Sequence, residues 1–287
     1  MNKPKPALSK YIPKSIVATS KGLAHLSRRI SAEWRVEPDF IIIGAQRAGT
    51  TSLFAYIVQH PQILKSSKKE IRYFDINYEK GDLWYRTHFP LALSMKDGTY
   101  ITGESSPYYL FHPHCSQRIR ERIPKVKLIV ILRDPVKRAI SHYFHEIRNK
   151  RESLPIMEAL QKEEERTATE IQKMYKDPNY RSFAHQHFSY KFRGIYVDQL
   201  SRYLQLFPSN QLLILKAEEL FSEPRKVMRD VYAYLNIDST FSPGDLTAKH
   251  VGSYTEEVHR DVHDYLRNYF RPHNERLYTF LGRDFGW

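Results

Sequence analysis

The chain has 287 residues, of which 41% are hydrophobic, so it can bury the core of one large α/β domain or two small ones and is neither disordered nor fibrous. Its 45 Lys and Arg residues and 32 Asp and Glu residues leave a net charge of +13, which suits a polyanionic partner such as a nucleotide, a nucleic acid, an acidic glycan or an anionic membrane. Cys115 is the only cysteine, which excludes an intramolecular disulfide and argues against a Cys-based zinc site.

Residues 1–36 are predicted to form a basic arm, flexible or lying on the surface, ahead of a domain at 37–287. The stretch Ser15–Ile30 has the pattern of a weakly amphipathic helix, which allows peripheral contact with a membrane. The chain as given has no apolar run of about eighteen residues or more and no secretory signal. The lone cysteine favours a reducing compartment, so we expect a cytoplasmic location.

Short apolar runs predict strands buried in a parallel sheet, at Asp39–Gly44, Tyr100–Gly103, Val126–Leu132 and Leu212–Leu215. Helical patterns follow or separate them, at Thr50–His60, Asp134–Arg151, Val197–Phe207, Arg225–Leu235 and Leu266–Leu281. This alternation predicts an α/β fold with a central parallel sheet covered by helices. The long polar segment 151–192 indicates a helical insertion, with a solvated helix around the charged run Lys162–Arg166.

The octet GAQRAGTT at Gly44–Thr51 joins the first predicted strand to the first predicted helix. Gly44 and Gly49 bracket a tight turn whose backbone N–H groups can approach an anion, and the start of the helix adds its positive dipole end. Arg47 supplies a fixed charge, and the hydroxyls of Thr50 and Thr51 can donate hydrogen bonds. The octet therefore predicts a phosphate-binding loop.

The pattern G-x-x-x-x-G-K-[ST] of nucleoside-triphosphate hydrolases is nearly met, but Thr50 stands where the lysine belongs and the cation, Arg47, lies inside the loop. This arrangement resembles the 5′-phosphosulfate loop of sulfotransferases that use 3′-phosphoadenosine-5′-phosphosulfate (PAPS). In that family a Lys or Arg at the position of Arg47 faces the bridging oxygen of the donor. The resemblance implies that the donor is bound by Gly44, Gln46, Arg47, Ala48, Gly49, Thr50, Thr51 and Ser52.

A second anion site is predicted where the strand Val126–Leu132 runs into a helix, for which Asp134 is a suitable N-cap and Pro135 a first-turn residue. Arg133 at the strand end and Ser141 two turns into the helix match the Arg and Ser that bind the 3′-phosphate of PAPS in sulfotransferases.

The resemblance extends over about residues 38–285, through stretches at Ser66–Pro90, Gly103–Leu110 and Arg193–Pro208 that look like heparan sulfate N-sulfotransferase domains and their bacterial relatives. It implies a P-loop-like three-layer domain and sulfuryl transfer from PAPS to a hydroxyl or amine, with release of adenosine 3′,5′-bisphosphate. Fixed cations and N–H groups suffice for this chemistry, so no metal is expected.

Three residues are predicted to be catalytic. Glu70 stands where the N-sulfotransferase family places its catalytic glutamate, and it would take the acceptor proton. His145, one helical turn after Ser141, matches a histidine thought to assist charge stabilisation or proton transfer. Arg47 replaces the lysine usual in the animal enzymes and can grip the phosphosulfate but cannot act as an acid.

Further donor contacts are expected from Arg193 and Tyr196, and from a late loop with Lys249 and Gly252. Ser105 stands where some glycan 3-O-sulfotransferases have a lysine, so the resemblance does not establish their acceptor specificity for this chain. The acceptor stays open between a glycan, another alcohol or amine and a small metabolite, and the sequence indicates no oligomeric state.

Two other functions would each explain part of the sequence. A small-molecule or nucleotide kinase would need a carboxylate to hold Mg²⁺, and the one candidate, Asp134, is better placed as a helix cap beside Pro135. A non-enzymatic polyanion-binding protein would explain the charge, but the basic residues are spread along the chain without a recognition module, so no nucleic-acid partner is expected.

Overall fold

The computed structural model describes residues 26–95, 98–249 and 258–287. Their centre is a four-stranded, wholly parallel sheet with the order β2-β1-β3-β4. The strands are β1 (Phe40–Gly44), β2 (Gly103–Ser105), β3 (Lys127–Leu132) and β4 (Leu212–Lys216). Side chains on both faces of β1 and β3 are buried, as expected for a parallel sheet between helices.

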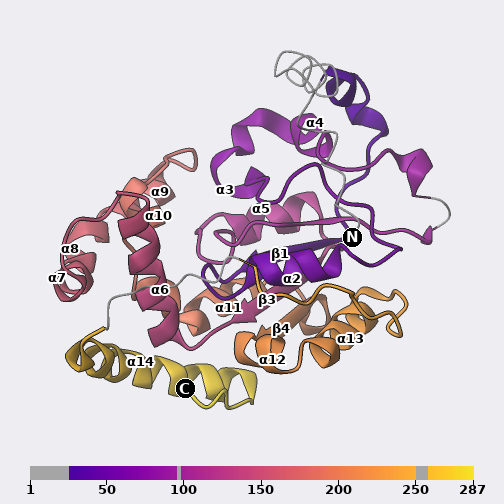
Figure 1. Ribbon diagram of the computed structural model, residues 1–287. Helices are drawn as coiled ribbons and strands as arrows, with labels where there is room; N and C mark the ends of the chain where they lie inside the picture. The colour runs from indigo at the N-terminus through magenta and orange to yellow at the C-terminus, as the bar shows by residue number, and fades with distance from the viewer. Residues whose placement is uncertain (1–25, 96–97, 250–257) are drawn as a thin grey trace, which may run out of the picture.

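Helices flank the sheet in a three-layer α/β arrangement (Figure 1). They are α2 (Thr50–Ile57), α3 (Tyr73–Ile76), α4 (Gly81–Arg86), α5 (Cys115–Arg122), α6 (Pro135–Arg148), α7 (Ile156–Gln161), α8 (Glu163–Thr167), α9 (Glu170–Lys176), α10 (Phe183–His187), α11 (Tyr196–Leu204), α12 (Ala217–Ser222), α13 (Pro224–Leu235) and α14 (Arg260–Leu281). Helix α2 packs against α13, and α14 packs along both α6 and α11. No helix of the described residues is long and apolar enough to cross a membrane.

The predicted fold class is confirmed, and three of the four predicted strands lie within one or two residues of β1, β3 and β4. The prediction for β2 is wrong: the strand covers Gly103–Ser105 instead of Tyr100–Gly103, and Ile101 forms only an isolated bridge with Ile63. Helix α2 ends at Ile57, short of His60, because the chain closes in a tighter turn in which the His60 N–H donates to the Ile57 carbonyl at 3.1 Å.

The segment 151–192 is helical, as predicted, but it is built from the short helices α7 to α10 and is not fully solvated. Glu163, in the charged run, is buried because its carboxylate accepts the backbone N–H groups of Lys191 and Phe192, at 2.6 and 2.8 Å. Burial, opposed by these bonds, raises the pKa of Glu163 to about 7. That the segment is an insertion stays a prediction.

Part of the predicted basic arm packs on the domain. Arg35 is buried and donates to the Phe89 carbonyl at 2.6 Å, and Arg28 donates to the Thr87 carbonyl at 3.0 Å. Residues 1–25 of the arm lie outside the described residues, and so does Gly252, one of the predicted donor-binding residues.

Candidate active site

Because all four strands are parallel, their carboxyl ends meet at one edge of the sheet, and ligands of open α/β sheets bind at this edge. The segments that leave this edge include the phosphate loop after β1, Arg133 and α6 after β3, and α12 after β4. The two predicted anion sites are therefore neighbours in space.

Within the phosphate loop, Arg47 and Gly49 have positive φ angles of 68° and 99°. Gly49 is the N-cap of α2, and a Cβ there would approach Phe221 Cζ to 2.9 Å in addition to its backbone strain. A Cβ on Gly44 would lie 2.6 Å from the Leu110 Cβ. Packing against Leu110, and not only access of an anion to the backbone, thus requires glycine at position 44.

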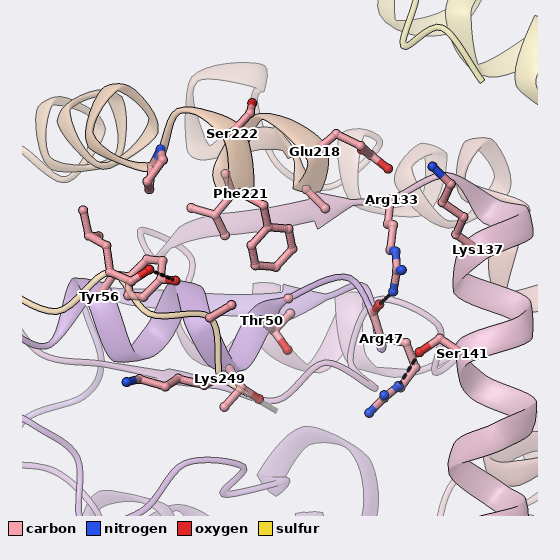
Figure 2. Close-up of a pocket in the computed structure, with 17 residues that line it drawn as sticks. Arg47, Thr50, Tyr56, Arg133, Lys137, Ser141, Glu218, Phe221, Ser222 and Lys249 are labelled. Atoms are coloured by element: carbon pink, nitrogen blue, oxygen red, sulfur yellow. Dashed lines mark hydrogen bonds between the residues drawn. The ribbon is translucent and has the colours of Figure 1, made fainter. Parts of the chain in front are cut away.

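Arg47, Arg133 and Ser141 are joined by hydrogen bonds (Figure 2). Arg47 Nε donates to Ser141 Oγ at 3.1 Å, and Arg133 Nη1 donates to the Arg47 carbonyl at 3.0 Å. The carboxylate of Asp134 caps α6, accepting from the Val136 and Lys137 N–H groups, as the sequence predicts for this helix start. Burial, followed by repulsion from Arg148, Arg133 and Arg138, lowers the pKa of Arg47 to about 10, so its side chain stays charged at neutral pH.

A pocket of about 850 Å³ opens above this cluster. Arg47, Arg133 and Lys137 gather at the end nearest α6, Tyr56 and Lys249 lie toward the other end, and Phe221 lies between (Figure 2). The predicted residues that line it are Arg47, Gly49, Thr50, Thr51, Arg133, Ser141 and Lys249. We call this cavity the donor pocket.

Several lining residues were not predicted, among them Tyr56, Lys137, Glu218 and Phe221. Lys137 lies one helical turn before Ser141, and the segment with Glu218 and Phe221 directly follows β4. The sequence signal for Glu218 and Phe221 was the predicted strand Leu212–Leu215, since residues after its carboxyl end must lie at the ligand-binding edge. Using that signal requires knowing that β4 lies beside β3.

A second, smaller cavity of about 40 Å³ is lined by Gln46, next to Arg47 in the chain, and by Glu70. We call it the Glu70 cavity. Glu70 has a positive φ of 59°, its N–H donates to the Ser105 carbonyl at 3.0 Å, and its half-exposed carboxylate accepts from Lys69 Nζ at 2.6 Å. Consecutive loop residues thus contribute to the two cavities, Gln46 to the small one and Arg47 to the large one.

His145 lies on α6, one turn beyond Ser141, with 32% of its side chain exposed. Partial burial, then the positive charge of Arg47, lowers its pKa, so the ring is neutral at pH 7. His142, also on α6, is completely buried and lies 3.5 Å from the carboxylate of Glu146, so it is a structural residue.

Glu146 is itself buried beneath His145. Its carboxylate accepts hydrogen bonds from Arg151 and His187, both at 3.1 Å. Burial would raise its pKa, but the nearby ring of His142 and the hydrogen bonds from His187 and Arg151 outweigh this and hold the pKa well below its usual range.

Other predicted residues lie away from the donor pocket. The Tyr196 hydroxyl donates to the Arg133 carbonyl at 2.8 Å, so Tyr196 positions the backbone of Arg133 and does not line the pocket itself. Ser52 is buried, and its Oγ accepts from the Lys249 N–H at 2.8 Å, which fixes the late loop over α2. Ala48 is buried in the core, and Arg193 lines the Glu70 cavity instead of the donor pocket.

Among the residues that the structure describes, no group of three or more His, Cys, Asp and Glu side chains is arranged to hold a metal ion.

Comparisons with known proteins bear on this site. The family model described as the sulfotransferase domain matches residues 37–268. Membrane-associated sulfotransferase kil1 of Dictyostelium discoideum is 29% identical over 87% of this chain and 66% of its own length, and human heparan sulfate glucosamine 3-O-sulfotransferase 3B1 is 32% identical over 87% and 65%. The chain therefore spans slightly less than two thirds of these curated relatives.

Among solved structures, a sulfotransferase from Alicyclobacillus acidocaldarius superimposes with a TM-score of 0.70 at 31% sequence identity, covering 87% of this chain and 97% of that one. These matches favour neither a kinase nor a non-enzymatic polyanion-binding protein. The family match covers most of the chain and includes both anion sites, so the chain belongs to the sulfotransferase domain family.

Proposed function

We propose that this chain transfers a sulfuryl group from PAPS to a hydroxyl or amine of an acceptor and releases adenosine 3′,5′-bisphosphate. The observation that carries this proposal is the donor pocket, where Arg47, Arg133 and Lys137 gather at one end and aromatic side chains lie farther along. Its volume of about 850 Å³ is within the range of nucleotide-sized ligand sites.

The residues at the cationic end fit the two phosphate positions of the donor. In this proposal Arg47 and the N–H groups at the start of α2 hold the 5′-phosphosulfate, and Arg133 with Ser141 holds the 3′-phosphate. Clustered like charges support this arrangement, because Arg47 is destabilised by Arg148 and Arg133 until an anion binds. Arg47 would also stabilise the negative charge that develops on the leaving phosphate.

The acceptor would approach from the other side of the loop, where Glu70 lines the smaller cavity. In this proposal the half-exposed Glu70 carboxylate takes the acceptor proton. The charge of Arg47 acts on His145 and helps to keep its ring neutral at pH 7. The neutral ring would accept a hydrogen bond from the reacting group of the acceptor.

The proposed acceptor is a glycan. The named heparan sulfate 3-O-sulfotransferase among the relatives supports a glycan acceptor. Ser105, the departure from some of those enzymes, is completely buried in β2 and cannot contact a glycan as a lysine tip would. A cytoplasmic location also stays a prediction, since another relative is named as membrane-associated.

The test is a comparison of melting temperatures with adenosine 3′,5′-bisphosphate and with ATP plus Mg²⁺. At 100 times its Kd a ligand stabilises the folded state by about 2.7 kcal/mol, so the bisphosphate should raise the melting temperature by several degrees. Labelled PAPS with a panel of acceptor glycans and alcohols then detects transfer. Stabilisation by ATP and Mg²⁺ but not by the bisphosphate would refute the proposal.

A further inference from the structure

The Glu70 cavity contains a buried positive charge that the proposed donor site does not use. The side chain of Arg193 is 1% exposed and lines this cavity. Its Nη2 donates to the carbonyls of His185 and Gln186, at 3.2 and 2.8 Å. Its Nε and Nη1 are buried and find no hydrogen-bond partner among the described residues. A charged donor that is buried without an acceptor raises the free energy of the folded state. In native proteins such a donor commonly binds a ligand or a water.

A second guanidinium reaches the same cavity. Arg72 Nε donates to Asp75 at 2.9 Å, but its Nη2 is buried without a partner among the described residues. Both guanidinium groups lie over the ring of Tyr108, Arg72 at 5.3 Å and Arg193 at 5.0 Å from its centroid. Tyr108 thus holds the two cations at one wall of the cavity.

The carboxylates nearby do not neutralise Arg193. Glu70 is bound by Lys69 at 2.6 Å, and Asp75 is bound by Arg72. Glu146, the carboxylate that acts favourably on Arg193, is already engaged by Arg151 and His187. Burial, and then the charge of Arg138, lowers the pKa of Arg193 to about 9, so the side chain is still protonated at neutral pH.

The cavity has the size of one small polar group. Its volume of about 40 Å³ exceeds the roughly 10–15 Å³ that a single water requires. Gln46 and Gln186 also line it, and the amide nitrogen of each can donate hydrogen bonds. Two arginines with unused donors, Arg72 and Arg193, therefore line a cavity that the proposed base, Glu70, also lines.

We propose that Arg72 and Arg193 bind an anionic group of the acceptor, a carboxylate or a sulfate, beside the hydroxyl or amine that is sulfated. The acceptor is then an acidic molecule, selected by the oxyanion next to its reactive group. This inference rests on the proposed function, since it assigns the Glu70 cavity to the acceptor. A guanidinium binds either oxyanion through paired N–H groups, and a neutral acceptor leaves the two arginines unpaired.

The test uses calorimetry on the full chain saturated with adenosine 3′,5′-bisphosphate. Three hexasaccharides of one backbone serve as probes: one of glucuronic acid and N-acetylglucosamine, the same with its carboxyl groups reduced to alcohols, and the reduced form carrying N-sulfates. We expect one or both charged probes to bind at least about tenfold more tightly than the neutral one. Preference for the first or the third identifies the oxyanion as a carboxylate or a sulfate.

Arg72→Gln and Arg193→Gln should each abolish this preference and leave the Kd of the bisphosphate within about twofold of wild type. Lys226→Gln, which removes an exposed charge on α13, should keep the preference and controls for net charge. Arg193→Gln also removes two bonds to backbone carbonyls, so Arg72→Gln provides the test if a melting curve shows that the former variant is unfolded.

Equal binding of the charged and neutral probes by wild type, or no binding of any, would overturn the inference. So would a matched loss of bisphosphate affinity in both variants, which would assign the arginines to the donor. Failure of the proposed function is distinguishable, because the wild-type chain would then neither bind the bisphosphate nor consume labelled PAPS.

Discussion

Arg47 shows how single residues prepare the site for an anion. Its guanidinium is partly desolvated and is surrounded by Arg133, Arg138 and Arg148, so that repulsion adds to the cost of burial. The contact with Ser141 Oγ at 3.1 Å orients the side chain without neutralising it. The repulsion among these charges raises the free energy of the ligand-free state. An anion bound among them would remove the repulsion, and this favours binding.

Glu70 is the proposed base for the acceptor proton. Glu70→Gln removes the proton acceptor and preserves the shape of the side chain, so turnover of labelled PAPS should fall by about two to four orders of magnitude. The Kd of adenosine 3′,5′-bisphosphate should stay unchanged, because Glu70 does not line the donor pocket. Calorimetry and a transfer assay measure the two quantities.

Glu79→Gln is the matched control, since Glu79 is also an exposed carboxylate of the same region and makes only a long contact of 3.6 Å with Arg181. It should retain wild-type turnover. If Glu70→Gln also retains it, another group takes the acceptor proton.

At the scale of elements, the parts of the fold that depend on local pattern could be predicted. The apolar runs of β1 and β3 are buried on both faces, and the Asp134 cap fixes the start of α6. Strand β2 could not be placed, because Gly103–Ser105 contains polar residues that are buried through side-chain partners outside the strand. Glu104 accepts hydrogen bonds from Tyr85 at 2.8 Å and Tyr109 at 3.1 Å, and neither pairing is visible in the sequence.

The candidate site divides in the same way. Residues in motifs, such as Arg47, Arg133 and Ser141, were found because each motif is local in the sequence, although the hydrogen bonds that join them link residues far apart in the chain. Phe221 was missed because its place in the donor pocket follows from the order of the strands. Arg193 was predicted as a donor contact from its place in the chain, whereas its position beside Glu70 depends on how the segment before α11 packs.

Glu104 also makes β2 sensitive to pH. Burial, opposed by hydrogen bonds from Ser106, Tyr85 and Tyr109, raises its pKa from 4.5 to about 7. The folded state therefore binds this proton more tightly than the unfolded state, and stability is lost as pH rises from about 4.5 through 7. Glu104→Gln removes this dependence and keeps an oxygen for the tyrosines.

Melting temperatures at pH 5, 6, 7 and 8 measure the effect. The difference in unfolding free energy between Glu104→Gln and wild type should shift in favour of the variant by roughly 1–3 kcal/mol from pH 5 to pH 8, or several degrees in melting temperature. This shift is expected whatever the difference between the two proteins at pH 5. Glu79→Gln should show no such trend, since its carboxylate is exposed. A constant difference between Glu104→Gln and wild type across the range would show that Glu104 is ionised throughout.

Across the whole molecule, the donor pocket joins segments that are far apart in the chain. Its walls come from the phosphate loop and α2, from α6, from α12, and from residues up to Lys249. Hydrogen bonds attach the segment that ends at Lys249 to α2. Ser52 bonds the backbone of Lys249, and the Tyr56 hydroxyl donates to the Leu246 carbonyl at 2.7 Å. A ligand that contacts all of these walls should oppose any unfolding that separates them.

Cys115 allows this coupling to be measured. The thiol is completely buried at the start of α5, within the core that includes the strands, and burial raises its pKa well above the usual value. A thiol reagent therefore reacts only after the core opens. With the reagent dilute enough that closing outpaces labelling, adenosine 3′,5′-bisphosphate at 100 times its Kd should slow labelling about 100-fold.

Arg133→Ala supplies the control, because loss of a cation from the donor pocket weakens the bisphosphate and should reduce the protection at the same ligand concentration. Its labelling rate without ligand reports any change in stability separately. If wild type binds the bisphosphate by calorimetry and yet Cys115 is labelled at an unchanged rate, then α5 opens while the donor pocket stays closed, and the sheet and its helices do not unfold as one cooperative unit.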